Sequence, residues 1–307
     1  MKDWRGDPKT WLALAGTLLL WASAFAGIRA GMQITPAGVP GPHGYGPGEV
    51  ALLRFGTASA VLALFAVLTR MRVPSRKDLP GIAVAGLVGI TVYHVSLNFG
   101  EQTVSSGAAA LLISAGPVFV ALLSVVFLGE RLTWEGWGGI AVAFAGVALI
   151  SVSGSGGLHF TPGALLVLLS ALATAAYFIL SKRLLRHYSA IEFTCYAIWA
   201  GTVPMLVFAP SFARQFQHAA PSATLAVVYL GIFPAAIAYV LSNYALSRMP
   251  ASLMTTFLYL SPVLAALIAW VWLGEVPALL TVVGGVVAIV GVIIVQTRGQ
   301  AREGAAT

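Results

Sequence analysis

The chain has 307 residues, of which 59% are hydrophobic and only 9% are charged, and it carries a formal net charge of +7. A soluble globular domain has roughly a quarter charged residues, so this composition excludes a soluble fold and predicts an integral membrane protein. The basic residues are spread between apolar runs rather than gathered on one face, which excludes nucleic-acid binding and is typical of membrane topology.

Ten apolar segments are long enough to cross a bilayer, because a membrane-spanning helix needs about 20 mostly apolar residues. Turn residues or charges separate the segments, as in 70–78 and 153–157. In chain order the predicted spans are residues 10–33, 46–69, 79–99, 105–128, 134–152, 161–181, 190–210, 221–246, 250–273 and 277–296. The sequence therefore predicts an all-α integral membrane protein with ten transmembrane helices.

The first segment has an alternative interpretation as a secretory signal peptide. Lys2, Arg5 and Lys9 precede an apolar run, and the Ala-Ser-Ala sequence at 22–24 resembles a cleavage site. The apolar run continues past this point through Phe25, however, and cleavage would destroy the internal repeat described below. A retained helix is therefore the preferred interpretation.

The basic residues predict the orientation of the spans. If the N-terminus is cytoplasmic, fourteen of the seventeen Lys and Arg fall on the cytoplasmic side and only Arg214 falls outside, while Arg29 and Arg54 lie within spans. The fourteen are Lys2, Arg5, Lys9, Arg70, Arg72, Arg76, Lys77, Arg131, Lys182, Arg183, Arg186, Arg248, Arg298 and Arg302. This asymmetry predicts ten spans with both termini in the cytoplasm.

The sequence also contains an internal repeat. At a shift of 145 residues, eight of the fifteen positions from 116 to 130 are identical to their partners. The matched positions include Asn98 with Asn243, Pro117 with Pro262, Gly139 with Gly284 and Gly146 with Gly291. A weaker match at a shift of 153 pairs Arg29 with Lys182. The duplication predicts two five-helix repeats, residues 1–156 and 157–307.

Five spans are an odd number, so the second repeat must enter the membrane from the opposite side. After the shared Gly-Glu pair, the cytoplasmic copy continues with Arg131 and the external copy with Val276, in agreement with this inversion. Inverted repeats are the architecture of many secondary transporters. Because the repeat supplies both halves of such an assembly, we expect a functional monomer.

Several short features carry a family resemblance. They are the Gly-Glu-Arg triplet at 129–131, the Gly-Glu echo at 274–275, the prolines of the fourth and ninth spans, and the Trp-Ala-Ser-Ala-Phe run at 21–25. With these features the chain, from residue 10 to 296, resembles the EamA-type branch of the drug/metabolite transporter superfamily. Within that branch it is most similar to YddG-type amino-acid exporters of bacterial inner membranes. The resemblance implies alternating-access transport, whereas the substrate class does not follow from the fold.

Pro117 and Pro262 are predicted near the centres of the fourth and ninth spans, at equivalent repeat positions. A proline inside a helix removes a backbone hydrogen bond and bends the helix, and the freed carbonyl is tolerated only beside protein or a wet cavity. We therefore expect a gating hinge or cavity edge at both prolines, with a static kink as the alternative. Tyr259 and Ser261 offer hydroxyls close to Pro262.

His94 is the most informative ionisable residue. It is predicted about 15 residues from the cytoplasmic end of the third span, roughly 20 Å deep at 1.5 Å per residue. With Tyr93 and Asn98 it forms a polar stripe at helical spacing. Polar groups at this depth usually face the bundle interior or a water-filled pathway, so we expect His94 to contact substrate or a proton. The alternative is a neutral imidazole that hydrogen-bonds a neighbouring helix.

Aromatic residues complete the predicted substrate site. Trp21 and Tyr177 occupy corresponding places in the first and sixth spans, away from the ends, and the other candidates are Trp199, Tyr239 and Asn243. An aromatic, weakly charged cavity suits neutral or aromatic amino acids, whereas phosphorylated substrates usually need converging Lys or Arg. The main prediction is export of such amino acids, and the alternative is export of drugs or nucleotide-related metabolites.

Acidic residues are nearly absent from the predicted spans, since Glu101 and Glu275 fall in loops. Proton coupling would then have to use His94, so an uncoupled facilitator is the preferred interpretation. Arg54, about eight residues into the second span, is interpreted as a structural residue that snorkels outward or pairs with Glu49. Attraction of a carboxylate to Arg54 is the alternative.

An enzyme is not expected, because the sequence offers no acid–base pair, nucleophile motif or metal-ligand cluster. A channel is a further alternative to a carrier. The single cysteine, Cys195, excludes an internal disulfide, and we expect no metal and no other cofactor. The expected partners are a small-molecule substrate and the lipid bilayer.

Overall fold

The computed structural model describes residues 7–35, 38–116, 118–119, 122–123, 132–152, 161–185, 187–246, 248, 257 and 260–298. Within these residues every regular element is a helix, apart from an isolated antiparallel bridge between Ile34 and Pro40. The all-helical prediction is confirmed for this part of the chain.

The helices of the first half are α1 (Pro8–Gly31), α2 (Pro47–Leu68), α3 (Leu79–Gly86), η1 (Leu87–Val92), α4 (Tyr93–Gly100), α5 (Ser106–Ile113) and α7 (Trp134–Val152). Those of the second half are α8 (Pro162–Leu184), α9 (Ala190–Met205), η2 (Leu206–Phe208), α10 (Ala209–Phe216), α11 (Pro221–Leu230), η3 (Gly231–Ile237), α12 (Ala238–Leu246), α14 (Ser261–Leu273) and α15 (Leu279–Arg298). The π-helices η1 and η3 each continue directly into the α-helices on either side, as the 3-10 turn η2 does.

Six helical stretches in the described part of the chain are long and apolar enough to cross a membrane. They are Pro8–Gly31, Pro47–Leu68, Leu79–Gly100, Pro162–Ser181, Ala190–Phe216 and Pro221–Ala245. Shorter apolar helices coincide with further predicted spans at Trp134–Ile150, Ser261–Leu273 and Leu279–Val295. Large apolar side chains such as Val271 are exposed on these helices, as expected for a surface in contact with lipid. The chain is a multi-pass membrane protein, and the total of ten spans stays a prediction.

Local signals explain where several helices begin. Pro8, Pro47 and Pro221 stand in the first turn of their helices, where a missing N–H costs no helical hydrogen bond. Asp7 caps α1, because its side chain accepts a hydrogen bond from the Lys9 amide at 3.1 Å. The predicted starts of these helices therefore agree with the structure to within a few residues.

Pro262 lies in the first turn of α14, which begins at Ser261 in the described residues. A gating hinge at Pro262 stays a prediction. Its repeat equivalent, Pro117, lies outside the described residues. Interior prolines occur instead at Pro204 in α9 and at Pro234 in η3. A proline is a usual cause of a distorted helix, and these two were not singled out by the sequence.

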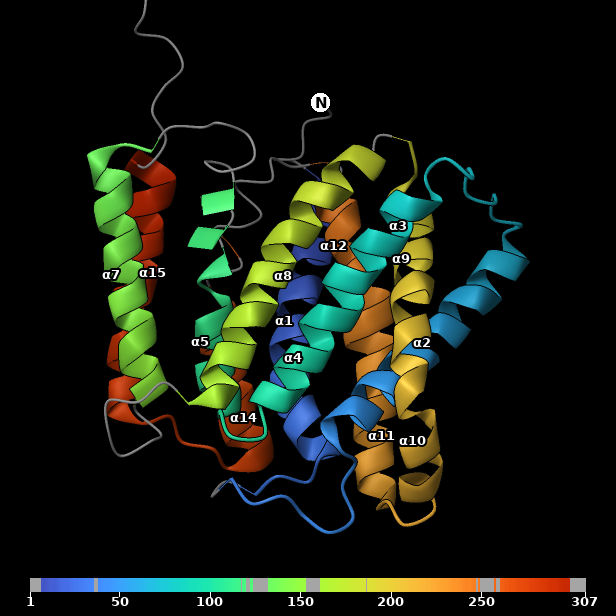
Figure 1. The fold of residues 1–307 in the computed structure, drawn as a ribbon, viewed down its shortest axis with the longest axis horizontal. Helices are drawn as coiled ribbons and strands as arrows, with labels where there is room; N and C mark the ends of the chain where they lie inside the picture. Colours follow the sequence, from blue (N-terminus) through green and yellow to red (C-terminus); the bar gives the residue numbers. More distant parts are fainter. Residues whose placement is uncertain are drawn as a thin grey trace, which may run out of the picture.

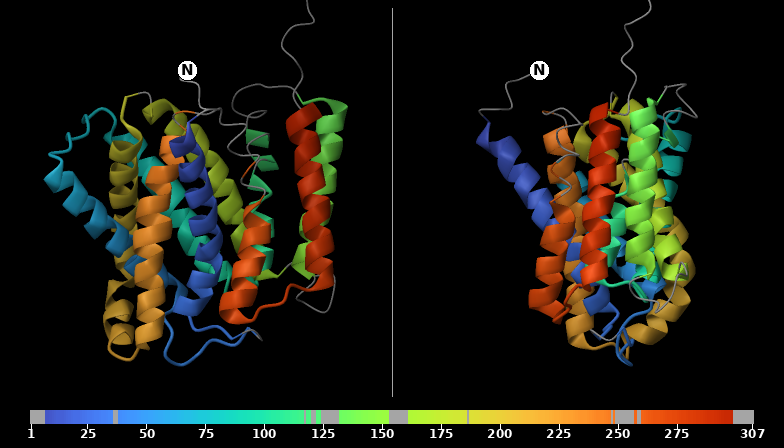
Figure 2. Two further views of the ribbon diagram at one scale, coloured as in Figure 1. Left: turned by 180° about the vertical axis from the view of Figure 1, so that it is seen from behind. Right: turned by 90° about the vertical axis from the view of Figure 1, so that its left-hand side faces the viewer.

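The helices pack in one bundle, with α7 and α15 side by side at one edge (Figures 1 and 2). Glycines allow these two helices to approach closely. A Cβ added to Gly139 would lie 2.9 Å from the Gly291 carbonyl oxygen, and one added to Gly284 would lie 2.8 Å from the Gly146 carbonyl oxygen.

Three connections lie together at one end of the bundle, which we call the Arg29 end (Figure 1). They are residues 32–46 between α1 and α2, residues 101–105 between α4 and α5, and residues 274–278 between α14 and α15. Helix α1 begins at the opposite end, where α15 finishes (Figure 2).

Candidate functional site

His94 lies among aromatic rings contributed by both halves of the chain. Its side chain is 2% exposed, and its Nε2 atom is 3.2 Å from the Tyr239 hydroxyl in α12. The His94 ring centroid lies 4.3 Å from that of Tyr93 and 4.4 Å from that of Phe55 in α2. Trp21 of α1 meets Tyr239 edge to face, with centroids 5.5 Å apart. We call Trp21, Phe55, Tyr93, His94 and Tyr239 the aromatic cluster.

Tyr177 of α8 belongs to the same hydrophobic core as Phe55 and Tyr239. Its ring stacks on Phe193 of α9 with centroids 6.0 Å apart. It also packs on Gly89 of η1, where an added Cβ would overlap the Tyr177 ring. The glycine lets Tyr177 approach the helical stretch that carries His94.

Several buried polar atoms here have no hydrogen-bond partner in the described structure. They include Trp21 Nε1, His94 Nδ1 and the Tyr177 hydroxyl. Buried polar groups in proteins are nearly always hydrogen-bonded, and the exceptions need an explanation such as water or a ligand. The arrangement is chemically suited to a small molecule that combines an apolar ring with polar groups.

Arg54 of α2 contacts the aromatic cluster, which the sequence interpretation did not anticipate. Its side chain is 2% exposed, and its guanidinium carbon lies 5.3 Å from the Phe55 ring centroid. It therefore does not snorkel to the surface. The ion pairs of the described residues do not include Arg54, so the expected pairing with Glu49 is also wrong. Both Nε and Nη1 of Arg54 lack a hydrogen-bond partner in the described structure.

The two predicted asparagines join neighbouring helices. Asn98 in α4 donates its Nδ2–H to the Pro47 carbonyl oxygen at the start of α2, at 3.0 Å. Asn243 in α12 donates to the Thr194 hydroxyl in α9, at 2.6 Å. These contacts are interhelical hydrogen bonds of the kind that stabilise membrane helix packing.

The remaining predicted site residues lie at more distant places. Trp199 donates its indole N–H to the Ser59 carbonyl oxygen at 3.2 Å and packs at the edge of the core that contains Tyr177. Ser261 is the first residue of α14, which packs against α1 and α5. Tyr259 lies outside the described residues. Substrate contact by any of these residues stays a prediction.

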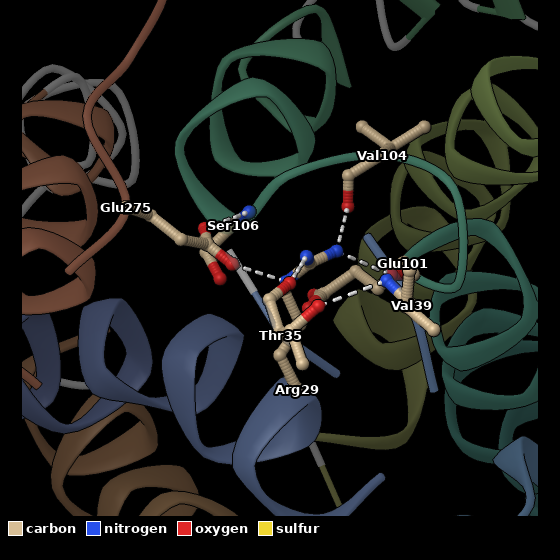
Figure 3. A network of polar contacts seen from close by, with 7 residues as sticks. All are labelled: Arg29, Thr35, Val39, Glu101, Val104, Ser106 and Glu275. Atoms are coloured by element: carbon tan, nitrogen blue, oxygen red, sulfur yellow. Dashed lines mark hydrogen bonds and ion pairs between the residues drawn. The ribbon is translucent and has the colours of Figure 1, made fainter. Parts of the chain in front are cut away.

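The Arg29 end is held by a buried polar network (Figure 3). Arg29 forms an ion pair through Nε with the Glu275 carboxylate, and that carboxylate accepts a hydrogen bond from the Ser106 amide at 3.1 Å. The Arg29 guanidinium also donates at 2.9, 3.1 and 3.2 Å to the carbonyl oxygens of Glu101, Val104 and Thr35. We call Arg29, Thr35, Glu101, Val104, Ser106 and Glu275 the Arg29 network. One guanidinium thus joins the connections at 32–46, 101–105 and 274–278.

Glu101 is a buried acid that the sequence interpretation treated as an ordinary loop residue. Its side chain is 0% exposed, and neither carboxylate oxygen has a hydrogen-bond partner in the described structure. Burial raises the pKa of Glu101 well above its ordinary value and Glu275 adds to this rise, while Arg29 and Arg54 oppose it. Glu101 can therefore hold a proton within electrostatic reach of both arginines.

A surface groove of about 340 Å³ also lies at the Arg29 end. Residues 42–44 line one side of the groove. The other side is formed by Arg214, Gln215, Gln217, His218 and Ala219. The groove shares no residue with the aromatic cluster, so it is separate from the site described above.

The repeat explains the central pair of the cluster. His94 and Tyr239 are related by the same shift of 145 residues that relates Asn98 to Asn243. His94 and Tyr239 are both predicted site residues, although their equivalence was not part of the prediction. The shift relates the two residues, and their contact is seen only in the structure.

Comparison with known proteins identifies the family. The EamA-like transporter family matches residues 8–152 and 161–297. The uncharacterized transporter YdfC of Bacillus subtilis is 43% identical over 273 residues, which cover 89% of this chain and 86% of the relative. A probable terminal-alkyne amino-acid exporter of Streptantibioticus cattleyicolor is 43% identical over 293 residues, which cover 95% of both chains.

A solved crystal structure shares the fold. It superimposes with a TM-score of 0.59 at 22% sequence identity. The superposition covers 94% of this chain and 96% of the chain in the solved structure.

Proposed function

Because the chain belongs to the EamA-like transporter family, we propose that it exports amino acids with neutral or aromatic side chains. Transport would proceed by alternating access, in which a central site opens first to one side of the membrane and then to the other. The observation that carries the proposal is the buried aromatic cluster around His94, with its unpaired polar atoms. The relative from Streptantibioticus cattleyicolor supports an amino-acid substrate.

The chemistry of the cluster fits this substrate class. Aromatic rings of Trp21, Tyr93 and Tyr239 offer edge and face contacts to an apolar or aromatic side chain. His94 Nδ1 and Trp21 Nε1 offer hydrogen bonds to a polar head group. We infer that opening of the cluster admits the substrate, since its side chains pack against one another in the present structure.

Two π-helices support the proposed division into inverted repeats, residues 1–156 and 157–307. At the repeat shift, η1 corresponds to residues 232–237, which lie within η3. Both π-helices therefore occur at the same place in their repeats, directly before the helices that carry His94 and Tyr239. The separate family matches to 8–152 and 161–297 support the same division.

The glycine contacts between α7 and α15 give independent support. Gly139 faces Gly291, and Gly284 faces Gly146. The repeat shift converts the first contact into the second, since it relates Gly139 to Gly284 and Gly146 to Gly291. Such an exchange is what a two-fold axis between the repeats produces.

We further propose that the Arg29 end faces away from the cytoplasm, as the distribution of basic residues predicts. In a Cys195→Ala background, Gln217→Cys at this end should react with an impermeant maleimide in intact cells. Arg76→Cys at the opposite end should react only after the membrane is permeabilised. The reverse labelling pattern would contradict the proposed orientation.

An uncoupled facilitator is the simplest form of this transporter. Proton-coupled export is the second candidate, and Glu101 favours it because its side chain is buried and burial raises its pKa. The coupling site would then be Glu101 rather than His94, which the sequence suggested.

Reconstitution in liposomes tests the proposed function. We expect saturable uptake of radiolabelled phenylalanine that neutral and aromatic amino acids compete for. His94→Ala should reduce the initial rate about tenfold, a typical cost for a buried hydrogen-bonding group. The control, His43→Ala, changes an exposed loop residue and should transport normally.

An imposed pH gradient separates the two candidates for energy coupling. Uptake that does not respond to the gradient supports the facilitator, and stimulated uptake that is lost in Glu101→Gln supports proton coupling. The absence of flux for every amino acid, in protein shown to be folded, would refute the substrate assignment.

A further inference from the structure

Arg54 is a buried cation that no carboxylate of the described residues neutralises through an ion pair. It follows the start of α2 at Pro47 by two helical turns, roughly 10 Å along the helix at 1.5 Å per residue. Its side chain is among the largest that are fully buried, and its Nε and Nη1 atoms have no hydrogen-bond partner in the described structure.

Arg29 shows how this protein satisfies a buried arginine that has a structural role. Both arginine residues are almost inaccessible, at 2% exposure. Arg29 has the Glu275 carboxylate and backbone carbonyl oxygens as partners. Arg54 has no equivalent set. A buried charge is costly unless it is paired, so the difference requires an explanation.

The surroundings of Arg54 belong to the proposed substrate site. The guanidinium lies over Phe55, whose ring contacts His94. The hydroxyls of Tyr93 and Tyr239 are close enough to interact with Arg54 electrostatically. Glu101 is the facing acid, and it lies within electrostatic reach of Arg54 without forming an ion pair with it.

We propose that Arg54 binds the carboxylate of the transported substrate, and that the apolar part of the substrate lies against the aromatic cluster. This inference rests on the proposed function and assigns the residue that recognises the carboxylate group of the substrate. A guanidinium is well suited to the role, because its fixed fork of N–H donors matches a carboxylate in charge and in geometry. The indole N–H of Trp21 also lacks a partner in the described structure, so it is a second donor for the substrate carboxylate.

Three related ligands test the proposal by calorimetry on the purified full-length protein. They are phenylalanine, phenylalaninamide, which lacks the anionic carboxylate, and 3-phenylpropionate, which lacks the ammonium group. Wild type should bind phenylalanine about tenfold or more tightly than the amide, as expected for hydrogen bonds to a charged group. Arg54→Gln should weaken phenylalanine and 3-phenylpropionate by a similar factor and leave the amide unchanged.

Matched variants separate recognition from folding. Arg214→Gln removes an exposed arginine from α10 and should leave every affinity unchanged. Arg54→Lys keeps the charge but loses the planar fork, so phenylalanine affinity should fall selectively but by less than in Arg54→Gln. If Arg54→Gln does not fold, as judged by gel filtration and thermal melting, the selective loss in Arg54→Lys is the deciding result.

The proposal is overturned if wild type binds phenylalanine and its amide equally, or if the Arg54 variants weaken both ligands equally or neither. Its failure can be told apart from that of the proposed function. Amino-acid transport without a selective effect of Arg54 would refute only the carboxylate site. Arg54-dependent binding of 3-phenylpropionate without amino-acid transport would refute only the amino-acid substrate.

Discussion

Arg29, Arg54 and Glu101 are single residues whose surroundings decide what they do. All three are buried within or beside apolar helices. Arg29 has a full set of partners and so stabilises one end of the bundle. Two nitrogens of Arg54 and both carboxylate oxygens of Glu101 lack a hydrogen-bond partner in the described structure, and we propose that they bind a ligand and a proton. His94, at the centre of the aromatic cluster, combines both situations. Its Nε2 atom is hydrogen-bonded to Tyr239, and its Nδ1 atom has no partner in the described structure.

Tyr239→Phe should test that hydrogen bond. The substitution leaves His94 Nε2 without its partner, which should lower stability by about 1 kcal/mol and reduce phenylalanine uptake in liposomes. Tyr45→Phe is the matched control, because it removes a hydroxyl bonded to Thr224 at 2.8 Å outside the cluster. Normal uptake by Tyr239→Phe together with impaired uptake by Tyr45→Phe would contradict the proposed site.

At the scale of the helices, glycines allow elements of the two halves of the chain to pack closely. An added Cβ at Gly86 of α3 would lie 2.6 Å from the Ala197 carbonyl oxygen in α9. An added Cβ at Gly231 of η3 would lie 2.6 Å from the Arg54 carbonyl oxygen in α2. Gly86 and Gly231 are related by the shift of 145 residues, so each half of the chain packs against the other through an equivalent glycine. This packing positions α2, with Arg54, beside the helix that carries Tyr239.

Gly146→Ala should destabilise the contact between α7 and α15. The new methyl group would meet backbone atoms of Ala288, which cannot rotate away as a side chain can. Overpacking of this kind costs about 1–3 kcal/mol, and thermal melting in detergent should detect it. Gly138→Ala is the control, since nothing lies within 4 Å of a Cβ added there. Equal melting temperatures for both variants would show that the helices are not closely packed at Gly146.

At the scale of the whole molecule, contacts between distant parts of the chain join the connections at the Arg29 end. We call this joined arrangement the closed structure. Arg29, the connection at 101–105 and Glu275 are brought together only when both halves of the chain have packed. We expect this closure to depend on the protonation of Glu101, because the charged form of a buried acid is poorly tolerated. A protonated Glu101 should therefore favour the closed structure.

The sign of the expected pH dependence follows from the raised pKa of Glu101. Stability from the buried neutral acid is fully present below the ordinary pKa, 4.5, and is lost as the pH rises through the raised value. The melting temperature of wild type should fall relative to Glu101→Gln over this range. Glu135→Gln removes an exposed acid and should follow wild type. Parallel pH profiles for wild type and Glu101→Gln would refute the prediction.

The amino-acid sequence alone was enough to predict the membrane setting, the helical class and the family resemblance. Each of these depends on local properties, namely the length of apolar runs, the residues between them and short motifs that survive in both repeats. It also singled out Trp21, Tyr93, His94 and Tyr239, which the structure places together, although their contact with substrate stays a prediction.

The partners of the buried charges became known from the packing of the helices. Arg29 and Glu275 are separated by 246 positions in the sequence (275 minus 29), and no local pattern predicts that they pair. Arg54 was misread because its position near a helix end suggested an exit to water, whereas the packing of neighbouring helices buries it completely. Burial and pairing are properties of packed surfaces, and they arise only when residues distant in the sequence meet.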